Sequence, residues 1–142
     1  MLANRVYRPR VNSTPLHEEN FHRLLRLLPP LQEGGHWTAY DAARQLRLEL
    51  VIRERFPYTS TVELSLFPLA DNPHFASCRL NVRIYHDARV AEVTGYQQHR
   101  RIASSYPYPN AHMLQPDERW QVNVLLKEVL DFCQRQGIRF DA

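Results

Sequence analysis

Three stretches of this chain alternate between apolar and polar residues, and this period of two limits the folds that the chain can adopt. The alternation covers residues 46–53, 59–67 and 78–85. It is typical of strands with one buried and one exposed face. Because short polar segments separate the stretches, we predict an antiparallel meander, not strands joined by crossover helices. Residues 36–41 and 90–98 complete a predicted sheet of about five strands.

The alternation breaks between Ile84 and Val90, where His86, Asp87 and Ala88 form a polar corner. We interpret this corner as a turn between two strands, because Asp readily bonds its own backbone in turns. No glycine occupies the positive-φ position that a two-residue hairpin prefers. A bulged or continuous strand therefore remains an alternative.

Two amphipathic helices are predicted to flank the sheet. The first has Thr14 as its N-cap, Pro15 in its first turn, and an end near Leu28 before two prolines. The second begins at Pro116 and ends at Gly137. Polar residues of the first helix are expected to face solvent: Glu18, Asn20, Arg23 and Arg26. The predicted fold class is α+β, with two layers and both helices on one face of the sheet.

Length and composition favour one domain, residues 14–142, preceded by a basic N-terminal arm, residues 1–13. The arm lacks the apolar region of a secretory signal, and no apolar run is long enough to span a bilayer. Cys78 and Cys133 lie within apolar patterns and are interpreted as core residues, which suits a cytoplasmic protein. The net charge of +3 and the pI near 9.1 are compatible with an anionic partner.

Several short motifs resemble the YqiB-like proteins, a bacterial family of unknown function. The resemblance spans about residues 18–137 and implies a small cytoplasmic protein. Because members tend to be encoded near genes for nucleotide-degrading enzymes, it also implies a connection with nucleotides. The matching residues are Glu19-Asn20-Phe21, Leu24, Leu27-Leu28-Pro29, Arg83, Tyr85-His86-Asp87-Ala88, Val90-Ala91-Glu92-Val93, Gln97-Gln98, Arg101, Tyr106, Tyr108-Pro109-Asn110, Gln115, Asp117-Glu118, Gln121 and Asn123.

No complete catalytic signature is present in the sequence. His86 and Asp87 are the candidates for catalysis, since a carboxylate can orient a histidine that acts as general base. Neighbouring strand residues point to opposite faces, however, so this pairing would need the corner to rotate them together. Neither a metal site nor a cofactor is predicted, because no histidine or cysteine pair has ligand spacing.

The most informative candidate site is a groove for an anionic ligand. Forked donors would come from Arg83, Arg100 and Arg101, while Tyr106 and Tyr108 stack on a base and Asn110 reads its edge. Alternatively, the arginines pair with Glu92, Asp117 and Glu118, and the tyrosines hold a loop against the sheet.

The resulting hypothesis is a non-catalytic binding or regulatory module for a nucleotide, RNA or an acidic protein partner. One alternative is a small hydrolase or nucleotide-processing enzyme that uses His86 and Asp87. Another is a homodimer that associates through the outer face or an edge of the sheet, where the outward parity includes Val51, Phe67 and Tyr85.

Overall fold

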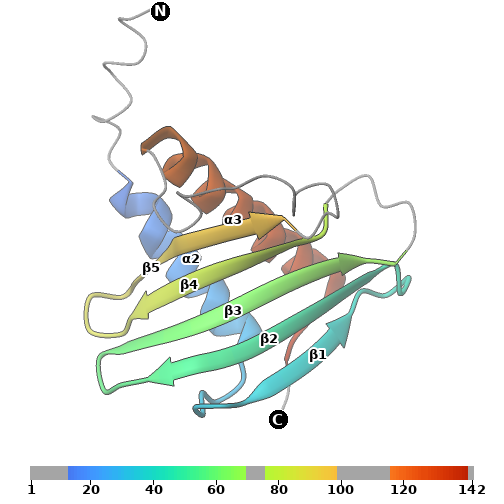
Figure 1. Ribbon diagram of the computed structural model, residues 1–142, viewed down its shortest axis with the longest axis horizontal. Helices are drawn as coiled ribbons and strands as arrows, with labels where there is room; N and C mark the ends of the chain where they lie inside the picture. Colours follow the sequence, from blue (N-terminus) through green and yellow to red (C-terminus); the bar gives the residue numbers. More distant parts are fainter. Residues whose placement is uncertain (1–12, 70–75, 99–115, 141–142) are drawn as a thin grey trace, which may run out of the picture.

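The computed structural model describes residues 13–69, 76–98 and 116–140. Two helices flank five strands along the chain (Figure 1). This arrangement confirms the predicted α+β class. The elements in order are α2 (Thr14–Leu27), β1 (His36–Tyr40), β2 (Leu46–Arg55), β3 (Thr59–Pro68), β4 (Cys78–Tyr85), β5 (Val90–Gln98) and α3 (Pro116–Gln136).

The sheet has the order β1-β2-β3-β4-β5, and each neighbouring pair is antiparallel. The meander predicted from the alternation is therefore confirmed. Residues of one parity on the three central strands are almost fully buried and form the core: Leu46, Leu48, Leu50, Ile52, Val62, Leu64, Leu66, Cys78, Leu80, Val82 and Ile84. The other parity lies on the opposite face, which is called the outer face below.

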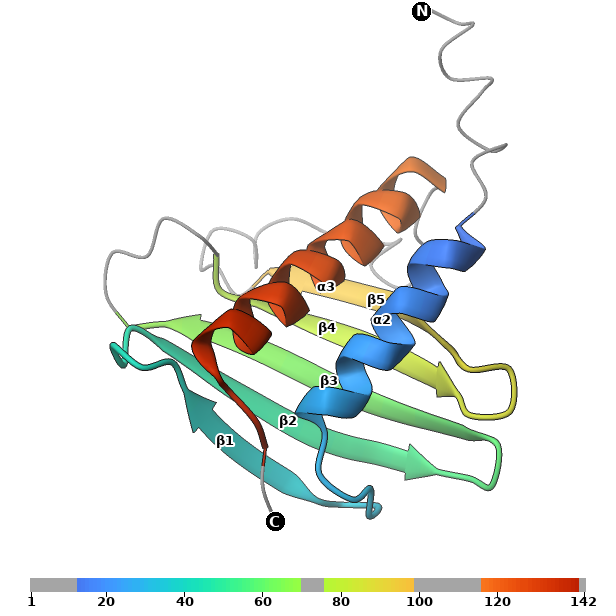
Figure 2. The same cartoon turned by 180° about the vertical axis from the view of Figure 1, so that it is seen from behind.

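Both helices lie on the same face of the sheet, side by side and running in the same direction (Figure 2). Leu24 of α2 and Leu126 of α3 are buried in the core that they share with the strands. Helix α2 begins one residue after Ser13, which takes the cap position expected for Thr14, with no side-chain cap hydrogen bond. No helix in the described ranges is long and apolar enough to cross a membrane.

The two ends of the sheet differ in how the strands are joined. At the end called the hairpin end, β2 turns into β3 and β4 turns into β5. The β4–β5 corner is a turn, as interpreted from the sequence, in which the N–H of Arg89 donates to the carbonyl of Tyr85 at 2.8 Å. Arg89 itself adopts the left-handed conformation, with φ 58°. At the other end, called the loop end, β1, β3 and β5 finish while β2 and β4 begin.

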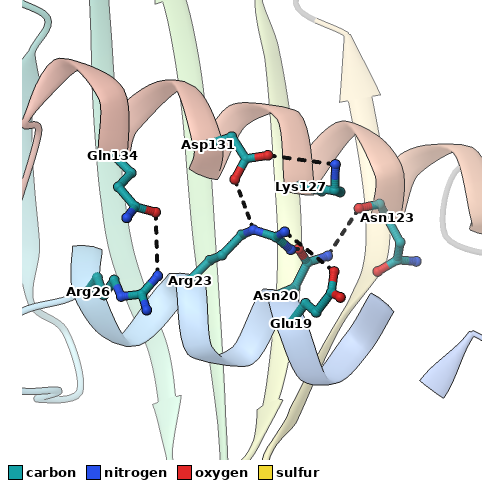
Figure 3. A network of polar contacts seen from close by, with 8 residues as sticks. All are labelled: Glu19, Asn20, Arg23, Arg26, Asn123, Lys127, Asp131 and Gln134. Carbon is teal, nitrogen blue, oxygen red and sulfur yellow. Dashed lines mark hydrogen bonds and ion pairs between the residues drawn. The ribbon is translucent and has the colours of Figure 1, made fainter. Parts of the chain in front are cut away.

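The expectation that the polar residues of α2 face solvent is wrong for Asn20, which is fully buried, and for the half-buried Arg23. Because α3 lies beside α2, this flank of the helix is an interhelical seam (Figure 3). Asn20 Nδ2 donates to the carbonyl of Asn123 at 3.1 Å. Arg23 Nε donates to Asp131 Oδ1 at 2.9 Å, and Arg23 Nη1 donates to Asn20 Oδ1 at 3.2 Å.

A side chain of α3 bonds to the backbone of β5, the last strand of the sheet. The N–H of Val93 donates to Asn123 Oδ1 at 2.9 Å. Unpaired backbone groups on an edge strand are a template for pairing with another chain. The Asn123 side chain therefore occupies a backbone group that would otherwise remain available to a further strand.

Candidate functional site

Aromatic and arginine side chains form a row across three strands on the outer face at the loop end. Tyr40 of β1 pairs with Arg47 of β2, which in turn pairs with Phe67 of β3. The guanidinium carbon of Arg47 lies 4.5 Å from the centre of the Phe67 ring. Arg47 Nε also lies 3.1 Å from Glu49 Oε2, an ion pair without the alignment of a hydrogen bond. The ring and the carboxylate together fix the position of this guanidinium.

A second arginine is placed over Tyr40 by the turn between β1 and β2. The buried carboxylate of Asp41 accepts the N–H groups of Gln45 at 2.7 Å and Leu46 at 2.9 Å. Within the turn, Arg44 adopts φ 56° and its N–H donates to the carbonyl of Asp41 at 2.9 Å. Its guanidinium carbon then lies 4.4 Å from the centre of the Tyr40 ring. Asp41 thus determines where the charge of Arg44 is held.

Arg79 of β4 extends the row with a third positive charge. Its strand partner is Ser65, the second residue before Phe67, so Arg79 and Phe67 are diagonal neighbours on the outer face. Arg79 is half-buried, and no carboxylate lies within ion-pair distance of it in the described parts of the chain. We call Tyr40, Arg44, Arg47, Phe67 and Arg79 the Arg–aromatic platform. Glu49 contributes one negative charge beside the platform, and the guanidiniums of Arg44, Arg47 and Arg79 contribute three positive charges.

The candidates predicted from the sequence divide between the two ends of the sheet. Arg83 is exposed on the outer face near the hairpin end, as the strand partner of Thr61 and Glu92. It stands five residues from Cys78, the partner of Gln98, which is roughly 16 Å along the strand. Five further candidates lie outside the described residues: Arg100, Arg101, Tyr106, Tyr108 and Asn110.

Glu92, Asp117 and Glu118 were the predicted structural acids. Glu92 is half-buried, and the hydroxyl of Tyr85 donates to its Oε1 at 3.0 Å. Burial raises the pKa of Tyr85, and the hydrogen bond to the Glu92 carboxylate raises it further. Asp117 lies in the first turn of α3, and Glu118 is exposed on the same helix.

The corner at His86 and Asp87 has contacts typical of a turn. Asp87 Oδ1 accepts the N–H of Ala88 at 2.9 Å, while His86 Nε2 lies 2.8 Å from the hydroxyl of Ser60. Burial lowers the pKa of His86, and the nearby charge of Arg55 lowers it further. Ser60 is fully buried, so a substrate has no direct path to its hydroxyl.

The described residues form no metal cluster, and the three apolar residues predicted on the outer face are separated from one another. No three His, Cys, Asp or Glu residues among them come together in a way that could hold a metal ion. Val51, Phe67 and Tyr85 all lie on the outer face, but in different cross-strand rows. Phe67 is at the loop end and Tyr85 at the hairpin end, so these three residues do not pack into one patch.

His17 of α2 is half-buried and predicts a pH-dependent stability. Burial lowers its pKa, an effect that the nearby negative charge of Glu92 only partly opposes. As the pH falls through about 6.5, the unfolded chain takes up a proton that the folded protein does not bind, so the free energy of unfolding falls. His86, whose pKa is also lowered, contributes with the same sign. Urea unfolding between pH 8 and pH 5 measures this slope.

The matched variant for this prediction is His17→Gln, whose neutral amide is polar like the imidazole but does not titrate in this range. We expect a shallower loss of stability in this variant than in the unmodified protein. An unchanged slope would show that His17 does not contribute to the acid sensitivity.

Comparison with known proteins assigns most of the chain to one family. The family model described as "Protein of unknown function (DUF1249)" matches residues 23–139. The chain belongs to the DUF1249 family. "Uncharacterized protein YqiB" from Escherichia coli strain K12 is 37% identical over 123 residues, which cover 86% of each chain. The proteins of that name from strains O6:H1 and O157:H7 match to the same extent. No solved structure matches the chain.

The platform of this DUF1249 protein includes residues that sequence reasoning did not select. Phe67, Arg47 and Arg79 could each be placed on the outward parity from the alternation alone. Their proximity depends on strand register, which the sequence pattern does not specify. No sequence pattern indicated Arg44, because its position depends on the turn that the Asp41 carboxylate holds.

Proposed function

We propose that this DUF1249 protein is a non-catalytic binding module that recognises a nucleotide or single-stranded RNA at the Arg–aromatic platform. The observation that carries the proposal is the pair of guanidiniums held over aromatic rings, Arg44 over Tyr40 and Arg47 over Phe67. Arg79 adds a charge with no ion-pair partner in the described ranges. Together they combine positive charge with aromatic surface on one accessible face.

This combination suits phosphate and base recognition. Arginine presents planar, forked donors that match phosphate oxygens, and bases stack on aromatic rings or guanidinium planes. A guanidinium already ordered by a ring loses less conformational entropy when it binds an anion. The platform therefore offers fixed donors for phosphates beside stacking surface for bases.

The segment after β5 is part of the proposal. Strand β5 ends at Gln98, the partner of Cys78, at the loop end of the sheet, where the platform also lies. We propose that Arg100, Arg101, Tyr106, Tyr108 and Asn110 add contacts to the same ligand. The register favours them over Arg83, which lies near the opposite end.

Arginine variants at the platform should weaken RNA binding. For the full chain and a fluorescein-labelled single-stranded RNA, we expect Arg79→Ala and Arg47→Ala each to reduce affinity about tenfold in an anisotropy titration, because each removes a charged hydrogen-bond donor. Each variant should also make the slope of log binding constant against log salt concentration shallower by about 0.7.

The control is Arg53→Ala. Arg53 carries the same charge and is exposed, but its Nη2 is bound to Glu63 Oε1 at 2.9 Å. Its loss should change affinity less than twofold. The proposal fails if neither RNA nor a mononucleotide binds saturably, or if Arg53→Ala and Arg83→Ala weaken binding as much as Arg79→Ala.

An enzymatic role for His86 and Asp87 has weaker support from the geometry. The Asp87 carboxylate bonds its own turn, and Ser60, the partner of His86, is buried. We further propose that residues 14–142 form a single domain that works in the cytoplasm. The free buried cysteines, Cys78 and Cys133, and a nucleotide or RNA ligand both fit that compartment.

A further inference from the structure

A cavity of about 340 Å³ lies at the C-terminal ends of α2 and α3, on the helical layer and therefore on the side opposite the platform. Its floor is formed by four buried apolar residues: Leu27, Leu130, Cys133 and Ile138. Burial raises the pKa of Cys133 to about 12, so the thiol stays neutral and the floor carries no charge. Arg23, Arg26 and Arg139 stand around this floor.

The wall after α3 is fixed by hydrogen bonds. Gly137 adopts φ 69°, and the N–H of Ile138 donates to the carbonyl of Cys133 at 2.8 Å, the pattern of a Schellman helix end. The N–H of Phe140 then donates to the carbonyl of Leu27 at 2.9 Å. The segment carrying Arg139 is therefore attached to both helices, and the cavity is formed before any ligand arrives.

The arginines around the cavity differ in their charge partners. Arg23 is paired with Asp131 at 2.9 Å and with Glu19 at 3.4 Å (Figure 3). The described partner of Arg26 is the neutral amide oxygen of Gln134, at 3.5 Å from its Nη1. Arg139 is exposed, and no carboxylate pairs with it in the described residues. Among the described residues, the charges of Arg26 and Arg139 thus have no carboxylate partner at the rim.

The helix dipoles decide how much negative charge this rim can accept. Both helices end here, and each C-terminus carries a partial charge of about −0.5, which opposes an anion. Two guanidiniums and two such ends sum to about one positive charge. The rim therefore matches a singly charged anion better than a dianion such as a phosphate monoester.

We propose that this cavity binds a small amphipathic monocarboxylate, with its carboxylate between Arg26 and Arg139 and its apolar body on the floor. The volume lies at the small end of the range for ligand pockets, which suits a medium-chain fatty acid or an arylalkanoic acid. The site shares no residue with the platform, so it does not depend on the proposed function.

The test uses the full chain with octanoate as the probe. Isothermal titration calorimetry should show saturable binding, and ¹⁵N NMR should show amide shifts concentrated at Gln134 and at Gly137 to Arg139. Arg26→Ala and Arg139→Ala should each weaken binding about tenfold through loss of a charge-assisted hydrogen bond. Octanol, which lacks the charge, should bind more weakly than octanoate. Octyl phosphate should bind no more tightly.

The matched control is Arg135→Ala. Arg135 is an exposed arginine in the last turn of α3 that does not line the cavity, so its loss should leave octanoate affinity within twofold. Arg26 and Arg139 are both exposed, so their variants should fold like the unmodified protein, as circular dichroism would verify. Equal losses in Arg135→Ala, or octanoate binding without shifts at the cavity amides, would overturn the proposal.

Discussion

Replacing Asn123 with alanine is expected to lower the free energy of unfolding by about 3 kcal/mol, because a buried backbone N–H loses its acceptor and a small cavity remains. Asn123 is 1% exposed, and its Oδ1 accepts the N–H of Val93. Its Nδ2 donates to the carbonyl of Arg119 at 2.7 Å, one turn earlier in α3. Alanine removes both contacts at once. Urea unfolding gives the change directly.

The largest part of this loss comes from Val93. The carbonyl of Arg119 can still accept the helical N–H of residue 123, but the N–H of Val93 faces the helical layer with no other acceptor in the described contacts. In native-state hydrogen exchange, the Val93 amide should therefore exchange faster in the variant, beyond the change in global stability. Gln121→Ala, on the exposed side of the same helix, should change stability by less than about 0.5 kcal/mol. A loss of similar size in both variants would mean that helix propensity, and not the buried bond, is responsible.

Much of the fold could be predicted from the sequence because the alternation in each strand indicates which of its residues are buried. The leucines and isoleucine at positions 46, 48, 50 and 52 are inward as expected. Short connections between such strands leave few topologies other than a meander, and the predicted order is the observed one. Pro15, Pro116 and Gly137 marked helix ends for local reasons that the tertiary structure did not alter.

The polar interior could not be predicted in the same way. The solvent assignment for Asn20 followed its polarity alone, although it lies four residues from both Leu16 and Leu24 on the buried side of α2. Its hydrogen-bond partner, the carbonyl of Asn123 on α3, could not be identified from the sequence. Likewise, the outward parity placed Arg47 and Arg79 on the outer face but did not show which aromatic residues stand beside them. Both failures concern contacts between segments distant in sequence, which depend on register and helix packing. The predicted groove, formed by Arg83 and the segment after β5, therefore stays a prediction, and the platform is a different set of residues.

Replacing Asp41 with alanine is expected to lower the free energy of unfolding by about 2 to 3 kcal/mol, because a single carboxylate oxygen accepts two backbone N–H groups in the β1–β2 turn. Asp41 is 6% exposed, so water replaces these bonds poorly. The turn also holds Arg44 at φ 56°, a conformation that a non-glycine residue adopts only when its surroundings impose it. Without the carboxylate, the chain is free to relax from that conformation.

Two further variants separate the role of the carboxylate from that of the arginine it positions. Asp41→Asn retains an acceptor oxygen and should lose less stability than Asp41→Ala, since hydrogen bonds to a neutral oxygen are weaker but still present. Arg44→Ala leaves both bonds to Asp41 Oδ1 in place and removes the guanidinium over Tyr40, so its free energy of unfolding should change by less than about 1 kcal/mol. If Arg44→Ala destabilises the protein as much as Asp41→Ala does, the cation–π contact and not the carboxylate holds the turn. We therefore expect the urea midpoint to be lowest for Asp41→Ala, intermediate for Asp41→Asn and highest for Arg44→Ala. This order follows only if the buried carboxylate organises this end of the sheet.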